Sequence, residues 1–246
     1  MEEITPTEKC SLANSPDVSG AEINKNKHMK KNNWVNVAAI IIWLVPIIYF
    51  ITIYASVPQT VPLHFGLNGK PDRYGSKEEM IWVNVLLSAV SLGVYFLIRF
   101  LPKIDPKKTA GYSAGAFKKI SILLVVLLSG IQLFVINASL GGNLSLIRFL
   151  FPVLGLFFAY LGNLMHSIKS NYFIGIRTPW TLEDEDTWRA THQLAGKLWF
   201  TGGIVITIAT LLFNYTIGSI IFISITVVIA IIPIVYSYIY FKKHKH

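Results

Sequence analysis

The chain has few charged residues and a single cysteine, and both shortages exclude whole classes of protein. Charged residues make up 14% of its 246 residues, whereas soluble domains carry about 25%. Cys10 alone cannot form a disulfide framework or a cysteine-based zinc site. Apolar residues make up 53% of the chain, which excludes disorder along its whole length. We therefore expect a polytopic membrane protein.

Long apolar stretches recur along the chain, and their length predicts the fold class. A helix needs about 20 mostly apolar residues to cross the hydrocarbon of a bilayer. The stretches that meet this requirement are Trp34–Tyr54, Ile81–Leu101, Ile120–Ser139, Ile147–Met165, Leu198–Phe213 and Ile217–Tyr240. The fifth is short unless its helix begins before Lys197. The pattern predicts an all-α polytopic membrane helix bundle with about six transmembrane helices.

Positive charges are divided unevenly between the connections, and this division predicts the orientation. The N-terminal segment, the second and fourth connections and the C-terminus together hold 17 of the 22 lysines and arginines. Because such residues accumulate on the cytoplasmic side, we expect both termini in the cytoplasm. The predicted organisation is a disordered cytoplasmic tail over residues 1–33, a six-helix membrane domain over 34–240 and a basic cytoplasmic tail over 241–246.

Catalytic and metal-binding motifs are missing from the sequence. No Ser-His-Asp, HExxH or glycine-rich phosphate motif occurs, so we expect no enzyme, no catalytic residue, no metal and no cofactor. A nucleic-acid partner would need a basic face on a soluble module, and none is predicted. All 13 acidic residues lie outside the expected spans, which argues against an ion-coupled pump.

Amide side chains are the main polar groups inside the expected spans. We expect them to form hydrogen bonds between helices, as polar groups in membrane helices commonly do. The alternative is that they line a polar transport cavity near the middle of the membrane. These residues are Asn84, Gln132, Asn137 and Asn163.

The first outer connection, residues 55–80, is expected to fold into a compact lobe. Pro58 and Pro62 restrict the residues before them to extended conformations, and Asn68-Gly69 is a strong tight-turn signal. The other outer connections are short, so an external ligand would mainly meet this loop. The alternative is that the loop only caps the bundle. The lobe would present His64, Phe65, Asp72, Arg73 and Tyr74.

The connection over residues 167–197 is expected to lie in the cytoplasm and to contain an amphipathic helix. Thr181 is the expected N-cap, because the acidic run Glu183–Asp186 follows it and stabilises the positive end of a helix. Arg177 would pair with this acidic run or hold a lipid phosphate. The alternative is that the loop residues only fold against the bundle. One face of the helix would carry Trp188, Thr191, His192, Ala195 and Trp199.

Motifs in these two connections resemble a known family. Asn171–Trp199 contains N-x-x-x-G-I-R-T-P-W-T followed by W-x-x-T-H-x-x-A-G, which resembles the signature of the SdpI family of bacterial multi-pass immunity proteins. The outer loop contains V-P-x-H-F-x-x-x-G-x-P-D-x-Y-G, which is similar to a small domain of unknown function that commonly precedes that signature. Nothing in residues 1–33 matches the family pattern.

The resemblance implies a membrane immunity protein of the bacterial cell membrane. Such proteins protect the cell from a secreted membrane-active antimicrobial peptide of the sporulation-delaying-protein type. Some are thought to act also as receptors that draw a cytosolic transcriptional repressor to the membrane. The implied partners are therefore membrane lipid, the peptide and such a repressor. An alternative function is a small transporter that exports a peptide or an amphiphile, and a third is an intramembrane enzyme or an accessory protein for envelope assembly.

The resemblance also assigns candidate residues to two roles. The candidates for external peptide recognition are His64, Phe65, Asn68, Asp72, Tyr74 and Gly75. The candidates for the cytoplasmic signature and signalling element are Asn171, Gly175, Arg177, Thr178, Pro179, Trp180, Trp188 and His192.

Overall fold

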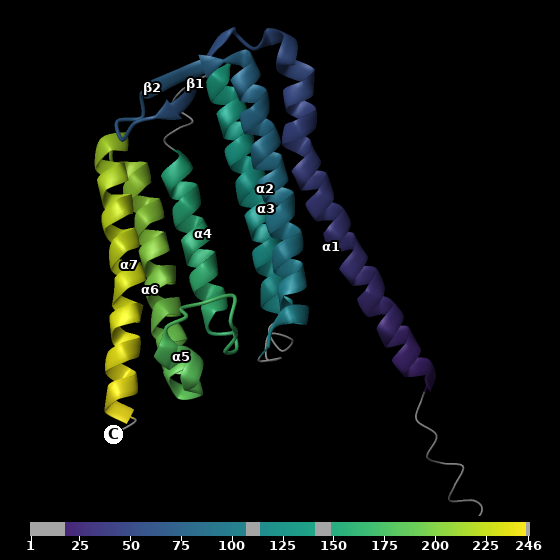
Figure 1. Ribbon diagram of the computed structural model, residues 1–246, viewed down its shortest axis with the longest axis vertical. Coiled ribbons are helices and arrows are strands. Elements are labelled where there is room, and N and C mark those ends of the chain that lie inside the picture. Colours follow the sequence, from purple (N-terminus) through teal and green to yellow (C-terminus); the bar gives the residue numbers. More distant parts are fainter. Residues whose placement is uncertain (1–17, 107–113, 141–148, 245–246) are drawn as a thin grey trace, which may run out of the picture. The chain divides into compact units, whose positions relative to one another are not determined.

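Long helices make up most of the structure, a computed structural model that describes residues 18–106, 114–140 and 149–244 (Figure 1). The chain divides into two compact units, residues 1–41 and 42–246, and the contacts below all lie within the second. In chain order the elements are α1 (Val18–Ile53), the short 3₁₀ helix η2 (Tyr54–Ser56), β1 (Thr60–Phe65), β2 (Pro71–Ser76), α2 (Lys77–Ile104), α3 (Ala114–Ser139), α4 (Leu150–Met165), α5 (Pro179–Glu183), α6 (Glu185–Leu212) and α7 (Tyr215–His244).

The all-α membrane bundle expected from the sequence is confirmed. Within the described residues, five helices are long and apolar enough to cross a bilayer: α1 from Trp34 onward, α2, α3, α6 and α7. The remaining apolar helix, α4, has 16 residues. At 1.5 Å per residue it is about 24 Å long, which is shorter than the roughly 30 Å of bilayer hydrocarbon.

Two helices begin well before the apolar stretches that predicted them. Helix α6 begins at Glu185, so the short fifth stretch is part of a continuous helix of 28 residues. Helix α1 begins at Val18, inside the segment 1–33 that is expected to be a disordered tail. Extending a formed helix costs far less than starting one, which favours such extensions. Residues 1–17 of the expected N-terminal tail, Ile147 of the fourth stretch and residues 245–246 of the C-terminal tail lie outside the described residues.

The prediction of Thr181 as a helix N-cap is wrong. Thr178 caps α5, with its side chain accepting a hydrogen bond from the Thr181 N–H, and Pro179 follows at the first helical position. Proline suits that position because its missing N–H would have no partner there. Asp184 then caps α6 and accepts a hydrogen bond of 2.8 Å from the Thr187 N–H. Two short capping signals therefore replace the single one predicted.

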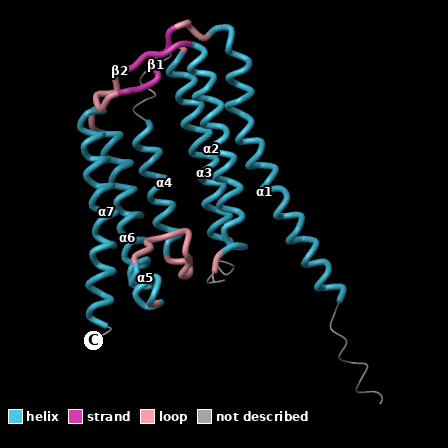
Figure 2. The backbone as a smooth tube through the Cα atoms, in the orientation of Figure 1, coloured by secondary structure: helices cyan, strands magenta, loops and turns pink. Residues whose placement is uncertain are grey.

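Glycines bring the backbones of α4 and α6 into direct contact. A Cβ atom on Gly162 would lie 2.8 Å from the Gly196 carbonyl oxygen, and one on Gly155 would lie 2.7 Å from the Gly203 carbonyl oxygen. In membranes, where the hydrophobic effect does not drive helices together, such close packing is a main source of helix association. Helix α6 also packs against α7, while α2 packs against α3 (Figure 2).

The buried amides form hydrogen bonds between helices but do not gather in one cavity. Gln132 of α3 donates to the side chains of Asn84 (3.1 Å) and Ser88 (3.0 Å) of α2. Asn137 accepts instead from the Tyr49 hydroxyl of α1 at 3.2 Å. Asn163 is exposed on α4. The idea of one transport cavity lined by all four amides is therefore wrong, because Asn84 and Gln132 line one hollow, Asn137 a second and Asn163 a third.

An indole on α6 replaces the hydrogen bond that a proline removes from α7. Pro233 has no N–H to donate to the carbonyl of Ile229, four residues earlier. The Trp199 indole N–H donates to that carbonyl at 3.0 Å. The kink-prone position in α7 is thus fixed by a contact with the neighbouring helix.

Candidate functional site

The connection over residues 55–80 forms a β-hairpin anchored on helix ends. Strands β1 and β2 pair antiparallel, from Thr60 opposite Ser76 to Phe65 opposite Pro71. Val61 of β1 is fully buried in a cluster with Met80 and Ile136 from α2 and α3. The compact lobe expected from the sequence is therefore present, and it is a two-stranded sheet.

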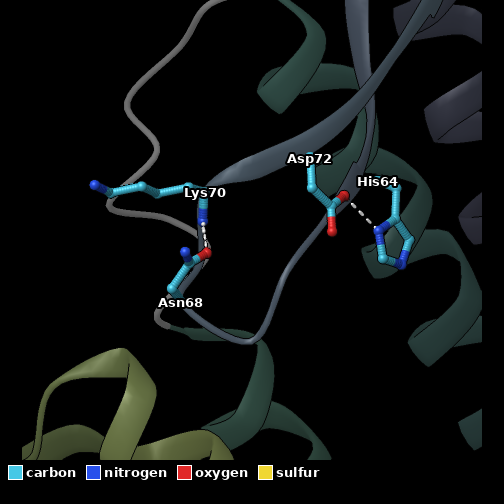
Figure 3. Close-up of polar contacts among 4 residues, drawn as sticks. All are labelled: His64, Asn68, Lys70 and Asp72. Atoms are coloured by element: carbon cyan, nitrogen blue, oxygen red, sulfur yellow. Dashed lines mark hydrogen bonds and ion pairs between the residues drawn. The ribbon is translucent and has the colours of Figure 1, made fainter.

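The turn of the hairpin is built by the residues that signalled it. Gly69 has a φ of 73°, a left-handed conformation that glycine adopts without strain, and its N–H donates to the Gly66 carbonyl at 2.9 Å. The Asn68 side chain accepts from the Lys70 N–H at 2.9 Å (Figure 3). Asn68 therefore shapes the turn with its side-chain oxygen.

His64 and Asp72 form an exposed pair across the two strands. The His64 Nδ1 atom lies 2.6 Å from the Asp72 Oδ1 atom, and both side chains are more than half exposed (Figure 3). An exposed pair of this kind contributes little to stability. Because both side chains are exposed, their polar groups are accessible to a ligand. No group of three His, Cys, Asp or Glu side chains able to hold a metal lies within the described part of the chain.

The other hairpin candidates divide into exposed and packed residues. Tyr74 is 58% exposed on β2. Phe65 faces α3, where its ring lies 6.5 Å from that of Phe134. A Cβ atom on Gly75 would overlap the ends of the Glu79 and Leu63 side chains, which would have to shift. Of the six candidates, His64, Asn68, Asp72 and Tyr74 are exposed, whereas Phe65 and Gly75 are partly covered.

The segment 167–178, which we call the signature loop, is organised around a buried amide. Asn171 is fully buried, and its Oδ1 atom accepts hydrogen bonds of 2.8 Å from the N–H groups of Phe173 and Ile174. Its Nδ2 atom donates to the carbonyls of Lys169 and Ile174 at 2.9 and 3.0 Å. One side chain thus satisfies four backbone groups that have no helix or strand to pair with.

A buried histidine ties the signature loop to α6. The His192 Nε2 atom accepts a 3.0 Å hydrogen bond from the Ile176 N–H. The proton must therefore be on Nδ1, which lies 2.8 Å from the Trp188 carbonyl oxygen and donates to it. The ring is consequently held in one neutral tautomer, stacked on the Trp188 indole at 4.0 Å between centroids.

Gly175 packs against the rings of His192 and Trp188, at a position that only glycine fits. Its φ of 113° disfavours every residue with a side chain, and a Cβ atom would overlap His192 Nε2 and lie 3.1 Å from the Trp188 ring. The Trp188 indole also donates to the Ile168 carbonyl at the start of the loop, at 2.8 Å. Both ends of the signature loop are therefore fastened to the same turn of α6.

The Thr-Pro-Trp segment ties the loop to α7. The Trp180 indole donates to the Ser237 hydroxyl at 2.5 Å, and its ring packs edge-on against Tyr238. The Thr178 hydroxyl lies 3.4 Å from the same serine oxygen. Ser237 is fully buried, whereas Thr178 and Trp180 are half-buried.

Arg177 and Pro179 are the exposed members of this otherwise packed group. The Arg177 guanidinium donates to the Tyr172 carbonyl at 2.6 Å, a partner that neither expectation for this residue included. The residue as a whole is exposed. The signature candidates thus form one assembly, and Arg177 is its accessible charge.

Sequence reasoning missed several residues that build these two sites. Ser237 and Ser219 are buried hydroxyls in an apolar helix. The Ser219 hydroxyl lies 3.2 Å from the Leu67 carbonyl oxygen of the hairpin turn and 2.8 Å from that of Thr216. Asp105 at the end of α2 accepts from the Tyr172 N–H at 3.4 Å. A hydroxyl in a membrane helix is itself a signal, because such side chains commonly form hydrogen bonds across helices.

The hairpin and the signature loop contact opposite ends of α7, near Ser219 and Ser237 respectively (Figure 1). The fold and these two sites therefore define a polytopic membrane protein whose two structured connections lie at opposite ends of one helix bundle.

Comparison with known proteins identifies the family. Residues 167–237 match the model of the SdpI/YfhL protein family, and residues 41–88 match a domain of unknown function, DUF1648. The chain is 30% identical to "Immunity protein SdpI" of Bacillus subtilis (strain 168) over 217 residues, 87% of this chain and 98% of the relative. The chain therefore belongs to the SdpI/YfhL family.

A second relative is more distant. An uncharacterized protein of Archaeoglobus fulgidus is 27% identical over 154 residues, which cover 51% of this chain and 82% of the relative. No solved structure matches the chain. The SdpI/YfhL match covers the signature loop, α5, α6 and most of α7. The DUF1648 match covers the hairpin and the helix ends that flank it.

Proposed function

We propose that this protein is a membrane immunity protein that protects its cell from a secreted membrane-active peptide of the sporulation-delaying-protein type. The observation that carries the proposal is the similarity to "Immunity protein SdpI", which extends over nearly all of that relative. Both termini and the signature loop face the cytoplasm in this proposal, as the distribution of lysine and arginine predicts. The protein acts by binding and has no catalytic role.

The hairpin is the proposed recognition site for the peptide. Its exposed tip offers an aromatic ring, a histidine–carboxylate pair and an arginine on adjacent strand positions, namely Tyr74, His64, Asp72 and Arg73. Such a mixture of ring and charge suits an amphipathic peptide that arrives from the aqueous side. The candidates Phe65, Asn68 and Gly75 support this surface from beneath by fixing the turn and the strand packing.

The signature loop is the proposed cytoplasmic element that reports peptide binding to a cytosolic transcriptional repressor. Signalling requires that the bound peptide favour one state of the bundle over another. Helix α7 supports such a link, because Ser219 contacts the hairpin turn and Ser237 contacts Trp180 and Thr178. Arg177 is the exposed charge through which the loop would meet its partner.

The test of the main proposal is protection of living cells. The chain is expressed in a toxin-sensitive bacillus that lacks its own immunity gene, and growth and membrane potential are recorded during challenge with purified peptide. We expect retained growth and potential, with cells carrying empty vector as the control. Cells that die although the protein is present in their membrane would contradict protection against this peptide.

The first prediction concerns Arg177. Arg177→Ala is expected to abolish function while leaving abundance unchanged, because an exposed side chain with one hydrogen bond contributes only about 1 kcal/mol to stability. Survival under peptide challenge and protein level are measured together. Lys243→Ala, which removes a positive charge from the end of α7, is the control and should protect fully. Full protection by the Arg177 variant would show that this residue only completes the loop.

The second prediction concerns Tyr74. Tyr74→Ala is expected to weaken peptide binding by about 2 kcal/mol, roughly 30-fold in Kd, because an exposed aromatic ring is a typical binding hot spot. Tyr74→Phe retains the ring and is expected to retain most of the affinity. Binding is measured on the full chain in nanodiscs, alongside the amount of folded protein. An equal loss of binding and of folded protein would indicate simple misfolding instead.

A further inference from the structure

A recess lies where the short helix α4 ends beside the longer helix α6. Two adjoining hollows, of about 320 and 400 Å³, share His166 as a lining residue. The first is lined further by Lys169, Glu185 and Arg189, and the second by Asn163, Gln193, Lys197 and Phe200. We call the two together the α4–α6 groove. The signature candidates Trp188 and His192 also line the first hollow, whereas none of the peptide-recognition candidates lines either one.

The groove follows from the lengths and the packing of the two helices. Helix α4 ends at Met165 after 16 residues, whereas α6 has 28 and continues beyond that point. Where the backbones meet, Gly162 and Gly196 both line the second hollow and contribute no side chains to fill it. A helix of about 24 Å is also shorter than the bilayer hydrocarbon, so its polar end lies at the depth of the lipid head groups or below.

The polar end of the groove carries excess positive charge. Lys169, Arg189 and Lys197 line it, against one carboxylate, that of Glu185. Arg189 is 3.9 Å from the Asp186 carboxylate, but both side chains are largely exposed, so this pair is weak. Basic recesses between membrane helices suit the phosphate of an anionic lipid.

The other end of the groove is apolar. Phe200 lies one turn of α6 beyond Lys197, and its side chain is 47% exposed. Ile204 continues the same helical face a turn further on. A groove that is cationic at its outer end and apolar toward the membrane interior matches both parts of a phospholipid. A free phosphate ion would make no favourable contact with the apolar wall of the groove.

We propose that the α4–α6 groove binds one anionic phospholipid. Its phosphate lies among Arg189, Lys197 and His166, and an acyl chain runs past Phe200 along α6. The bound lipid fills the space that the short α4 leaves beside α6. This proposal is independent of the immunity function, because it concerns the bilayer and no peptide.

The test is native mass spectrometry of the full chain in detergent with added lipid. We expect one phosphatidylglycerol to bind much more tightly than phosphatidylcholine. The double variant Arg189→Gln/Lys197→Gln should weaken phosphatidylglycerol binding about 30-fold, since each basic residue contributes about fivefold. The control Lys242→Gln/Lys243→Gln removes the same charge from the end of α7 and should bind as the parent does.

A second variant tests the recess itself. Asn163→Trp retains every charge but fills the second hollow, so it should also lose phosphatidylglycerol while remaining folded, because Asn163 is exposed. Equal binding of the two lipids, or an equal loss in the α7 control, would overturn the proposal. Displacement of the lipid by millimolar inorganic phosphate would overturn it as well, because the site would then select phosphate alone.

Discussion

Replacing Gly203 with alanine is expected to destabilise the packing of α4 against α6 by about 1–3 kcal/mol, the usual cost of overpacking. The new Cβ atom would overlap the backbone nitrogen of Ala159 and the carbonyl oxygen of Gly155, and would lie 2.9 Å from the Ala159 Cα atom. All three are backbone atoms, so no side-chain rotation can relieve the overlap. The two helices would have to separate.

The separation would also break a hydrogen bond between the helices. The Thr207 hydroxyl lies 3.2 Å from the Pro152 carbonyl of α4, and it already donates to the Gly203 carbonyl at 2.8 Å. Thermal unfolding of the full chain in detergent measures the loss. Gly93→Ala in α2 is the matched control, because nothing lies within 4 Å of a Cβ atom there. A control as unstable as the Gly203 variant would show that helix contact is not the cause.

The bundle is predictable from sequence because the bilayer imposes a simple requirement. Any chain segment inside hydrocarbon must satisfy its own backbone hydrogen bonds, so an apolar stretch of sufficient length becomes a helix. The stretches near Ile81 and Ile217 accordingly correspond to α2 and α7. Neither the contact of α4 with α6 nor its dependence on Gly162 and Gly203 could be predicted, because which helices meet depends on residues distant in sequence.

The two candidate sites differ in how much of their geometry is local. The hairpin turn is predictable, because Asn68 and Gly69 need only their immediate neighbours to form it. The signature loop depends on long-range contacts, such as that of Trp180 with Ser237, 57 residues later. The buried helical face at Trp188 and His192 was predictable from its spacing, but its contact with Ile176 was not.

Replacing Gly175 with alanine is expected to disrupt the signature loop severely, although it adds only one methyl group. The backbone at a φ of 113° disfavours alanine by about 1–3 kcal/mol, and overlap with the His192 ring adds about 1–3 kcal/mol. The combined loss, about 2–6 kcal/mol, would release the loop from α6. Hydrogen–deuterium exchange of residues 171–178 in the full chain measures it, and we expect faster exchange there than in the parent.

A double variant separates the two causes. His192→Ala alone should also speed exchange in the loop, because it leaves the Ile176 N–H without its acceptor. In Gly175→Ala/His192→Ala the ring that the methyl group would overlap is gone, so the combined cost should be smaller than the sum of the two. Strict additivity would mean that backbone strain alone accounts for the effect of the alanine. A less-than-additive result would show that glycine is required because the loop packs directly on the neutral imidazole of His192. The same imidazole accepts the hydrogen bond from the Ile176 N–H.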